Sequence, residues 1–299
     1  MIRLGFVTIL SLICSINLLD MRDADYTVFP TPKIMMKGNY SLKLNNSCKF
    51  FFQDSKNTNN IINHKFYGKI LDIYSEILHR KCFNQKNYDL TIKPYHFNYF
   101  LNPSECFYVI GLNVDKYELL DFNANNQELT KESESYELDI TYMGNTPKIT
   151  LNVKYLNGLI RGLESLSQLI GEDFELKNLP LYIKDKPDFA YRGLMIDTGR
   201  HYLSVEKIKT IIRGMMHSKL SVLHWHIVDN ESFPYDTPIL NNSNAEGEGY
   251  SKNDIINLVF YAKTRGVTIV PEFDNPSHTR SWDRHLKTKF IISSSERWR

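Results

Sequence analysis

Hydrophobic and polar positions follow two different patterns along this chain, and the first extends from residue 26 to about residue 151. Short apolar runs at 41–44, 107–110 and 136–140 are each bounded by Asn, Gly, Pro or Asp. Such runs are typical of β-strands that are separated by turns. We therefore expect several strands in this half of the chain.

Two segments of the first half have helical spacing instead. Residues 62–79 carry apolar side chains three and four positions apart, and residues 156–170 do so with one clear apolar face. Gly158 and Gly162 lie in the second segment, and their spacing predicts close packing against a sheet. Gly171 is expected to cap the end of that helix. Strands and helices together predict a small α+β domain.

The pattern changes after Pro180 and Pro187, which we expect in an extended linker. Three apolar runs follow, at 193–197, 222–229 and 267–274, and amphipathic helical segments separate them. Strands that alternate regularly with helices predict a parallel sheet.

Each of the three predicted parallel strands ends in a carboxylate. The acids are Asp197, Asp229 and Asp274. The two connecting helices are expected to begin at Ser204 and Ser251, which are good N-caps. In parallel α/β sheets the carboxyl ends of the strands share one edge, and ligands bind there. We therefore place the candidate chemistry at this edge.

The composition limits the class of protein. The 299 residues include 36 basic and 34 acidic side chains, so the net charge is +2. A nearly balanced charge gives no field that would attract nucleic acid or an acidic membrane surface. The length and the hydrophobic content of 42% are sufficient for two domains with packed cores.

The first 19 residues are predicted to be a secretory signal peptide. An apolar run from residue 4 to residue 19 follows Met1 and Arg3, and it is short for a membrane-spanning helix. We expect cleavage to leave no stable membrane anchor, and the alternative is that the segment is retained as an anchor. The mature protein is then expected in the secretory pathway, in a lysosome-like compartment or outside the cell.

Cysteines and glycosylation sequons fit such a route. Removal of the signal leaves three cysteines, so at most one internal disulfide can form and its pairing is left open. These are Cys48, Cys82 and Cys106. Four Asn-x-Ser sequons predict a glycoprotein. They begin at Asn39, Asn45, Asn230 and Asn241.

Three sequence blocks around the carboxylates are specific enough to indicate a family. They are residues 191–202 (YRGLMIDTGRHY), 224–234 (HWHIVDNESFP) and 271–279 (PEFDNPSHT). In this order they resemble the first three barrel strands of the family 20 glycoside hydrolases, the β-N-acetylhexosaminidases. The helix at 157–166 resembles the last helix of that family's N-terminal zincin-like domain, which carries no zinc.

This resemblance implies a division of the chain. An α+β zincin-like domain is expected at 26–186, and an incomplete (β/α)8 TIM barrel with about three βα units at 187–282. Residues 283–299 show no family character and are set apart as an aberrant or divergent tail. Ser277 stands where the family usually has Gly, a departure that bears on the turn before His278.

The resemblance also implies a reaction. The family releases terminal β-linked N-acetylglucosamine or N-acetylgalactosamine with retention, and the substrate's own acetamido oxygen is the nucleophile. An Asp-Glu pair after the fourth strand supplies the general acid, and this sequence contains no Asp-Glu dipeptide. We therefore expect N-acetylhexosamine-terminated glycans as partners, no cofactor, an active full-length parent and an inactive 299-residue chain.

Arg192 is the substrate-binding residue that the resemblance implies. It is expected at the mouth of the first barrel strand, where its planar fork of donors would hold sugar hydroxyls. The alternative is a structural salt bridge to Asp197 or Asp188.

Three further residues are expected to support catalysis. Asp229 and His278 match the family's acid–imidazole pair, which tunes the general acid. Asp274 lies four residues before His278 and is expected to orient it or to lie near the acid. The alternatives are a strand-end cap for Asp229, a turn histidine for His278 and a loop cap for Asp274. Glu272 shares a strand face with Asp274, and the two could mimic a paired-carboxylate acid/base site, but we expect framework roles for them.

Two other kinds of function are kept open. His224 and His226 lie on one strand face and, with Asp229 or His278, could form the metal site of a barrel hydrolase. A non-catalytic carbohydrate-binding module is the other alternative. Homodimerisation of the full-length parent is left open.

Overall fold

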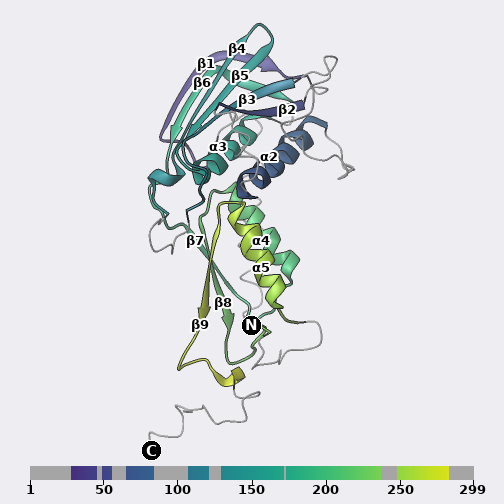
Figure 1. The fold of residues 1–299 in the computed structure, drawn as a ribbon, viewed down its shortest axis with the longest axis vertical. Helices are drawn as coiled ribbons and strands as arrows, with labels where there is room; N and C mark the ends of the chain where they lie inside the picture. The colour runs from purple at the N-terminus through teal and green to yellow at the C-terminus, as the bar shows by residue number, and fades with distance from the viewer. Residues whose placement is uncertain are drawn as a thin grey trace, which may run out of the picture.

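A computed structural model describes residues 28–45, 49–55, 65–83, 107–120, 129–171, 173–236 and 248–282. The predicted signal peptide, the side chains of the three candidate disulfide cysteines and the tail at 283–299 lie outside the described part. The described residues form two halves, one around each of two sheets (Figure 1).

The first half is built on a six-stranded sheet in the order β1-β6-β4-β5-β3-β2. Its members are β1 (Ile34–Lys43), β2 (Lys49–Asp54), β3 (Phe107–Val114), β4 (Tyr136–Met143), β5 (Thr146–Val153) and β6 (Glu175–Asp185). The pairs β1–β6, β6–β4 and β4–β5 are antiparallel, whereas β5–β3 and β3–β2 are parallel. A short 3-10 helix, η1 (Glu132–Glu134), leads into β4.

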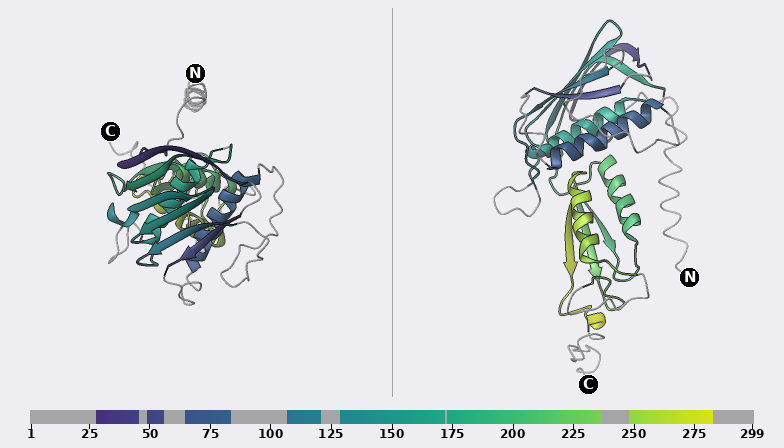
Figure 2. Two further views of the ribbon diagram at one scale, coloured as in Figure 1. Left: turned by 90° about the horizontal axis from the view of Figure 1, so that it is seen from above. Right: turned by 45° about the vertical axis from the view of Figure 1, so that its right-hand side comes forward.

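Two helices cover one face of this sheet and lie side by side on it (Figure 2, right). They are α2 (Lys65–Phe83) and α3 (Leu156–Leu169), which the sequence predicted with slightly different ends. A Cβ on Gly158 would lie 2.3 Å from the carbonyl oxygen of Ser135, and one on Gly162 would lie 2.4 Å from Leu151 of β5. The predicted close packing of this helix is therefore confirmed, and the half agrees with the predicted α+β class.

Two expectations about the edges of this half are wrong. Gly171 is not a left-handed cap, because the chain leaves α3 through an extended Ile170 that bridges to Leu176. Pro180 is not in a linker but inside β6. The sheet accommodates it because two β1 residues, Gly38 and Asn39, lie opposite it in a β-bulge.

The second half is a three-stranded parallel sheet in the order β7-β8-β9. The strands are β7 (Gly193–Asp197), β8 (Val222–Val228) and β9 (Thr268–Phe273), and α4 (Val205–His217) and α5 (Lys252–Lys263) connect them. The predicted caps are present: Ser204 accepts from the N–H of Lys207, and Ser251 and Asp254 form a capping box. Gly266, with a φ of 70°, ends the turn after α5.

A buried ionic network joins the two halves. Arg161 of α3 donates to Glu134 at 2.6 Å and to the carbonyl oxygens of Leu220 and Gly266 in the second half. Arg192, just before β7, contacts the same carboxylate at 2.7 Å. Lys219 donates back to Ser165 of α3 at 2.7 Å. The carboxylate of Glu134 is fully buried between the two guanidinium groups, so the halves are coupled through it.

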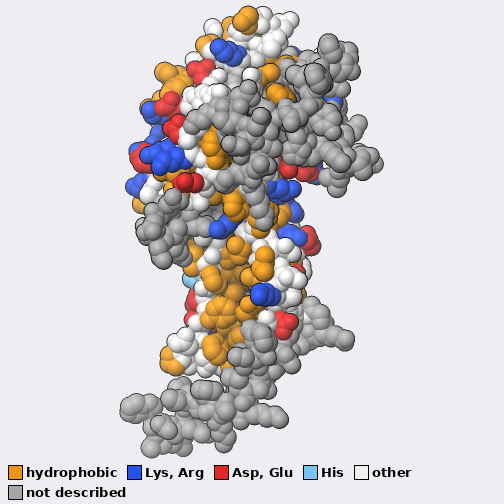
Figure 3. Space-filling model, viewed as in Figure 1, with side chains coloured by type: hydrophobic (Ala, Val, Ile, Leu, Met, Phe, Trp, Pro, Cys, Tyr) orange, Lys and Arg blue, Asp and Glu red, His pale blue; other side chains and the backbone are white. Residues whose placement is uncertain are grey.

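Apolar side chains gather on the side of the second half that Figure 3 shows. Leu194, Met195 and Phe273 of its sheet are among the exposed large hydrophobic residues.

Among the described residues, none of the helices combines the length and the apolar character that a membrane-spanning helix requires.

Candidate functional site

The register of the parallel sheet brings the predicted acids to one edge. Asp197 is paired with His226, and His226 is paired with Glu272, so three titratable residues lie in one row across the strands. Asp229 directly follows β8 and Asp274 directly follows β9. The carboxyl ends of the strands therefore form a polar edge, as the sequence pattern predicted.

Arg200 lies at this edge, in the turn that follows β7. Its backbone N–H and its Nη1 both donate to Asp197, at 3.0 and 2.5 Å, and its Nη2 lies 2.7 Å from Oδ2 of Asp229. The side chain is still 45% exposed. Two carboxylates thus hold the guanidinium in place while part of it faces solvent, where it can donate to a neutral polar ligand such as a sugar.

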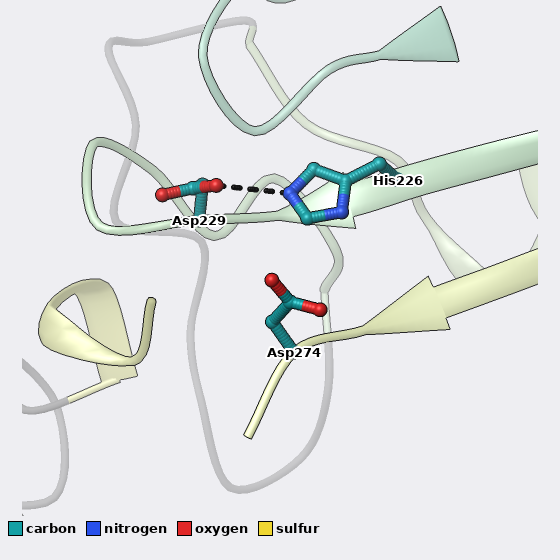
Figure 4. A group of neighbouring side chains, drawn as sticks. All are labelled: His226, Asp229 and Asp274. Atoms are coloured by element: carbon teal, nitrogen blue, oxygen red, sulfur yellow. Dashed lines mark hydrogen bonds and ion pairs between the residues drawn. The ribbon is translucent and has the colours of Figure 1, made fainter. Parts of the chain in front are cut away.

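Asp229 is almost completely buried and accepts hydrogen bonds on both oxygens. Oδ1 accepts from the N–H of Asn230 at 2.6 Å, and Oδ2 accepts from Nε2 of His226 at 2.9 Å (Figure 4). Burial alone would raise the pKa of Asp229, but these hydrogen bonds and the charge of Arg200 lower it. Asp229 is therefore ionised and fixed in orientation.

His278 lies beside Asp229 and Asp274. Its Nδ1 is 2.7 Å from Oδ2 of Asp274, a hydrogen bond, and 3.8 Å from Oδ2 of Asp229. The hydrogen bond to His278 is the main cause that lowers the pKa of Asp274. Asp274 thus orients the ring, as one of the two expected roles requires. The left-handed residue of this turn is His278 itself, with a φ of 60°, and not Ser277.

Arg192 is in a different place from the one expected. It precedes β7 and so lies at the amino end of the strand, opposite the polar edge. Its guanidinium donates to Glu134 and to the carbonyl oxygens of Phe189, Ala190 and Lys219. Its position at the strand mouth was therefore predicted wrongly. The salt bridge that we kept as the alternative is correct in kind, but its partner is Glu134.

Three residues of the same edge could offer ligand atoms to a metal ion. His226, Asp229 and Asp274 each offer one ligand atom, and these atoms lie within 4.8 Å of one another. However, the oxygen that Asp229 would offer is already 2.7 Å from a guanidinium nitrogen of Arg200. A cation there would meet a fixed positive charge on its own ligand, so this set does not fit a divalent ion well.

Two family models match the chain and together account for most of it. "Glycosyl hydrolase family 20, catalytic domain" matches residues 189–298, and "beta-acetyl hexosaminidase like" matches residues 28–169. The chain belongs to glycosyl hydrolase family 20. The match to the catalytic domain extends past residue 282, where we expected the family character to end.

Proteins named beta-hexosaminidases are among the relatives of this chain. It is 45% identical over 142 residues to Beta-hexosaminidase 1 of Arabidopsis thaliana, covering 44% of this chain and 26% of that protein. It is 36% identical over 202 residues to Beta-hexosaminidase subunit beta of Homo sapiens, covering 60% of this chain and 36% of that protein. The chain therefore spans about a third or less of the length of these two relatives.

Solved family 20 structures share the fold. The chitobiase of Flavobacterium johnsoniae superposes with a TM-score of 0.62 at 26% identity, over 87% of this chain and 36% of that one. The exo-β-N-acetylglucosaminidase of Vibrio harveyi, solved with N-acetylglucosamine, superposes with a TM-score of 0.58 at 20% identity, over 88% of this chain and 39% of that one.

Arg200 is the residue of this family 20 site that the sequence analysis missed. A signal for it was present, because Arg200 lies three residues after Asp197, within the turn that leaves the carboxyl end of β7. An arginine in that turn can fold back on the strand-end carboxylate, whereas an arginine that precedes the strand cannot.

Proposed function

We propose that this chain forms the part of a β-N-acetylhexosaminidase that binds the sugar and sets the protonation of the catalytic acid. In this proposal residues 26–186 form the family's zincin-like domain and residues 187–282 form the first part of its TIM barrel. The substrates are glycans that end in β-linked N-acetylglucosamine or N-acetylgalactosamine. The protein reaches them through the secretory pathway.

One observation carries the proposal. Arg200, Asp229 and His278 meet at the carboxyl ends of three parallel strands in a family 20 chain. The Arg200 guanidinium supplies directional donors for the hydroxyls of a neutral sugar. Asp229 and His278 supply an ionised carboxylate beside an imidazole, which is an arrangement that can set the protonation of a neighbouring acid.

In the proposed reaction the acetamido oxygen of the substrate attacks the anomeric carbon, and a carboxylic acid protonates the leaving oxygen. His278, oriented by Asp274 and facing Asp229, would hold that acid in its protonated form before the reaction. The acid itself belongs to an Asp-Glu pair in the family, and no Asp-Glu dipeptide occurs in these 299 residues. We therefore propose that the 299-residue chain binds the sugar but does not turn it over.

Sugar binding and turnover test the two parts of this proposal. We expect the purified chain to bind N-acetylglucosamine in an NMR titration and to release no 4-nitrophenol from 4-nitrophenyl N-acetyl-β-glucosaminide. Arg200→Ala should weaken binding about tenfold or more, the usual effect of losing a charged hydrogen bond. Arg213→Ala, on the exposed side of α4, is the matched control and should bind as the unaltered chain does.

Each part can fail separately. Equal binding by Arg200→Ala and the unaltered chain would contradict the sugar-holding role. Turnover by the 299-residue chain would contradict its proposed inactivity, if it is abolished by an inhibitor that mimics the ring formed when the acetamido oxygen attacks the anomeric carbon.

A further inference from the structure

Glu272 lies between two histidines of the neighbouring strand. Its Oε2 is hydrogen-bonded to Nε2 of His224, and its Oε1 is 3.2 Å from Nδ1 of His226. The pairing of β8 with β9 places His226 opposite Glu272, so the contact is a consequence of strand register. Glu272 touches neither Arg200 nor His278 in the described contacts, and the proposed mechanism gives it no task.

His226 is held by a carboxylate on each side. The residue is 3% exposed, its Nδ1 faces Glu272 and its Nε2 lies 2.9 Å from Oδ2 of Asp229. Nδ1 makes no hydrogen bond within the described residues, and the carboxylate oxygen that lies 3.2 Å from it has no proton to donate to a bare ring nitrogen. The geometry therefore favours a ring that carries a proton on both nitrogens. Burial opposes this charge, but the contacts with Asp229, Asp197 and Glu272 raise the pKa of His226 above its ordinary value.

The charged ring in turn fixes Asp229. The oxygen that accepts from His226 is the same Oδ2 that faces Arg200 at 2.7 Å and His278 at 3.8 Å. Rotation of His226, or loss of its Nε2 proton, would leave that oxygen without its buried donor. The orientation of the Asp229 carboxylate therefore depends on the contact of Glu272 with Nδ1, on the other side of the His226 ring.

We propose that Glu272 is a positioning residue that acts through His226 on Asp229. It keeps the Nδ1 proton of His226 in place, so that Nε2–H always points to Asp229. Among the described residues, the other titratable or charged groups around this ring and its two carboxylates are Asp197, His224, Asp274, His278 and Arg200. The effect of Glu272 on His226 does not depend on the proposed function. Only its consequence for catalysis, through the orientation of Asp229, rests on that function.

The protonation of one ring tests the inference without any turnover. Long-range ¹H–¹⁵N NMR on the full 299-residue chain resolves histidine ring nitrogens, and the His226 signals are assigned by their loss in His226→Gln. We expect His226 to carry protons on both nitrogens at pH 6.5, and its titration midpoint to fall by about one unit or more in Glu272→Gln, as loss of a neighbouring opposite charge requires. Glu206→Gln, an exposed carboxylate on α4, is the matched control and should not move it.

The outcomes separate this inference from the proposed function. A His226 ring with a single proton at pH 6.5 in the unaltered chain would overturn it, and this measurement does not depend on whether Glu272→Gln folds. An unchanged midpoint in a folded Glu272→Gln would also overturn it. Failure of sugar binding would leave these signals as they are and would affect only the proposed function.

Discussion

Arg192 and Arg200 lie at opposite ends of β7 and are held in different surroundings. The guanidinium of Arg200 is pinned by Asp197 and Asp229 but stays half open to solvent. That of Arg192 is mostly buried, which lowers its pKa, while Glu134 acts in the opposite direction. The first arrangement leaves donors free for a ligand. The guanidinium of Arg192 instead uses its donors in contacts that help to join the two halves of the molecule.

Arg192→Met is therefore expected to affect stability. The change leaves the buried carboxylate of Glu134 with Arg161 alone, and breaking a buried ion pair from one side costs about 3–5 kcal/mol. Urea denaturation followed by circular dichroism measures the loss. Arg213→Met on exposed α4 is the control and should change the unfolding free energy by less than about 0.5 kcal/mol. Equal midpoints for the two variants would show that the junction does not depend on Arg192.

For single residues, the sequence predicted positions correctly where hydrophobic periodicity and strand register determine them. Asp229 and Asp274 were placed correctly at the strand ends, because parallel strands of similar length must end at one edge. Arg192 was placed at the wrong end, because a basic residue beside a strand does not show which partner will bury it. Its partner, Glu134, lies 58 residues away in the other half, and no local pattern links the two.

Glycines show how elements pack. Gly158 and Gly214 both lie inside helices, where alanine is usually favoured over glycine by about 1 kcal/mol. A Cβ on Gly214 would meet nothing within 4 Å, whereas one on Gly158 would lie 2.3 Å from a backbone oxygen of Ser135. The two positions have the same local propensity and opposite surroundings.

Opposite signs are therefore expected for two identical substitutions. Gly214→Ala should raise the free energy of unfolding by about 0.5–1 kcal/mol through helix propensity. Gly158→Ala should lower it by about 1–3 kcal/mol, because α3 must move away from the chain that leads into β4. Thermal melting of both variants tests this. Stabilisation by Gly158→Ala would mean that α3 does not pack as closely as described.

For helices and strands, local sequence signals predicted the caps at Ser204 and Ser251 and the parallel second sheet. They failed at Gly171 and Pro180. Gly171 follows a helix whose last residue is drawn into a bridge with β6, and Pro180 is tolerated only because β1 forms a bulge opposite it. Both outcomes depend on pairing with a distant strand, which a single segment does not reveal.

The whole molecule depends on a polar junction between its two halves. Arg161, Glu134, Arg192 and Lys219 are drawn from both halves and are at least mostly buried. Packing supplements these contacts, because Met216 of α4 belongs to the core of the first half. Relative movement of the halves would expose charges that now satisfy one another, so the junction favours a single arrangement.

Lys219 should make the stability of this junction depend on pH. Desolvation lowers the pKa of Lys219 to about 8 in the folded chain, against an ordinary value of 10.5. Between these values the unfolded chain binds more protons, so the unfolding free energy of the unaltered protein should rise with pH. Lys219→Met lacks this group, so the unfolding free energy of the unaltered protein should rise by roughly 1–3 kcal/mol relative to that of Lys219→Met between pH 8 and pH 10.5. Urea denaturation at several pH values measures the difference, with Lys207→Met on the exposed side of α4 as the control. Parallel pH curves for Lys219→Met and the unaltered protein would show that Lys219 keeps an ordinary charge, and that the halves meet less closely than these contacts describe.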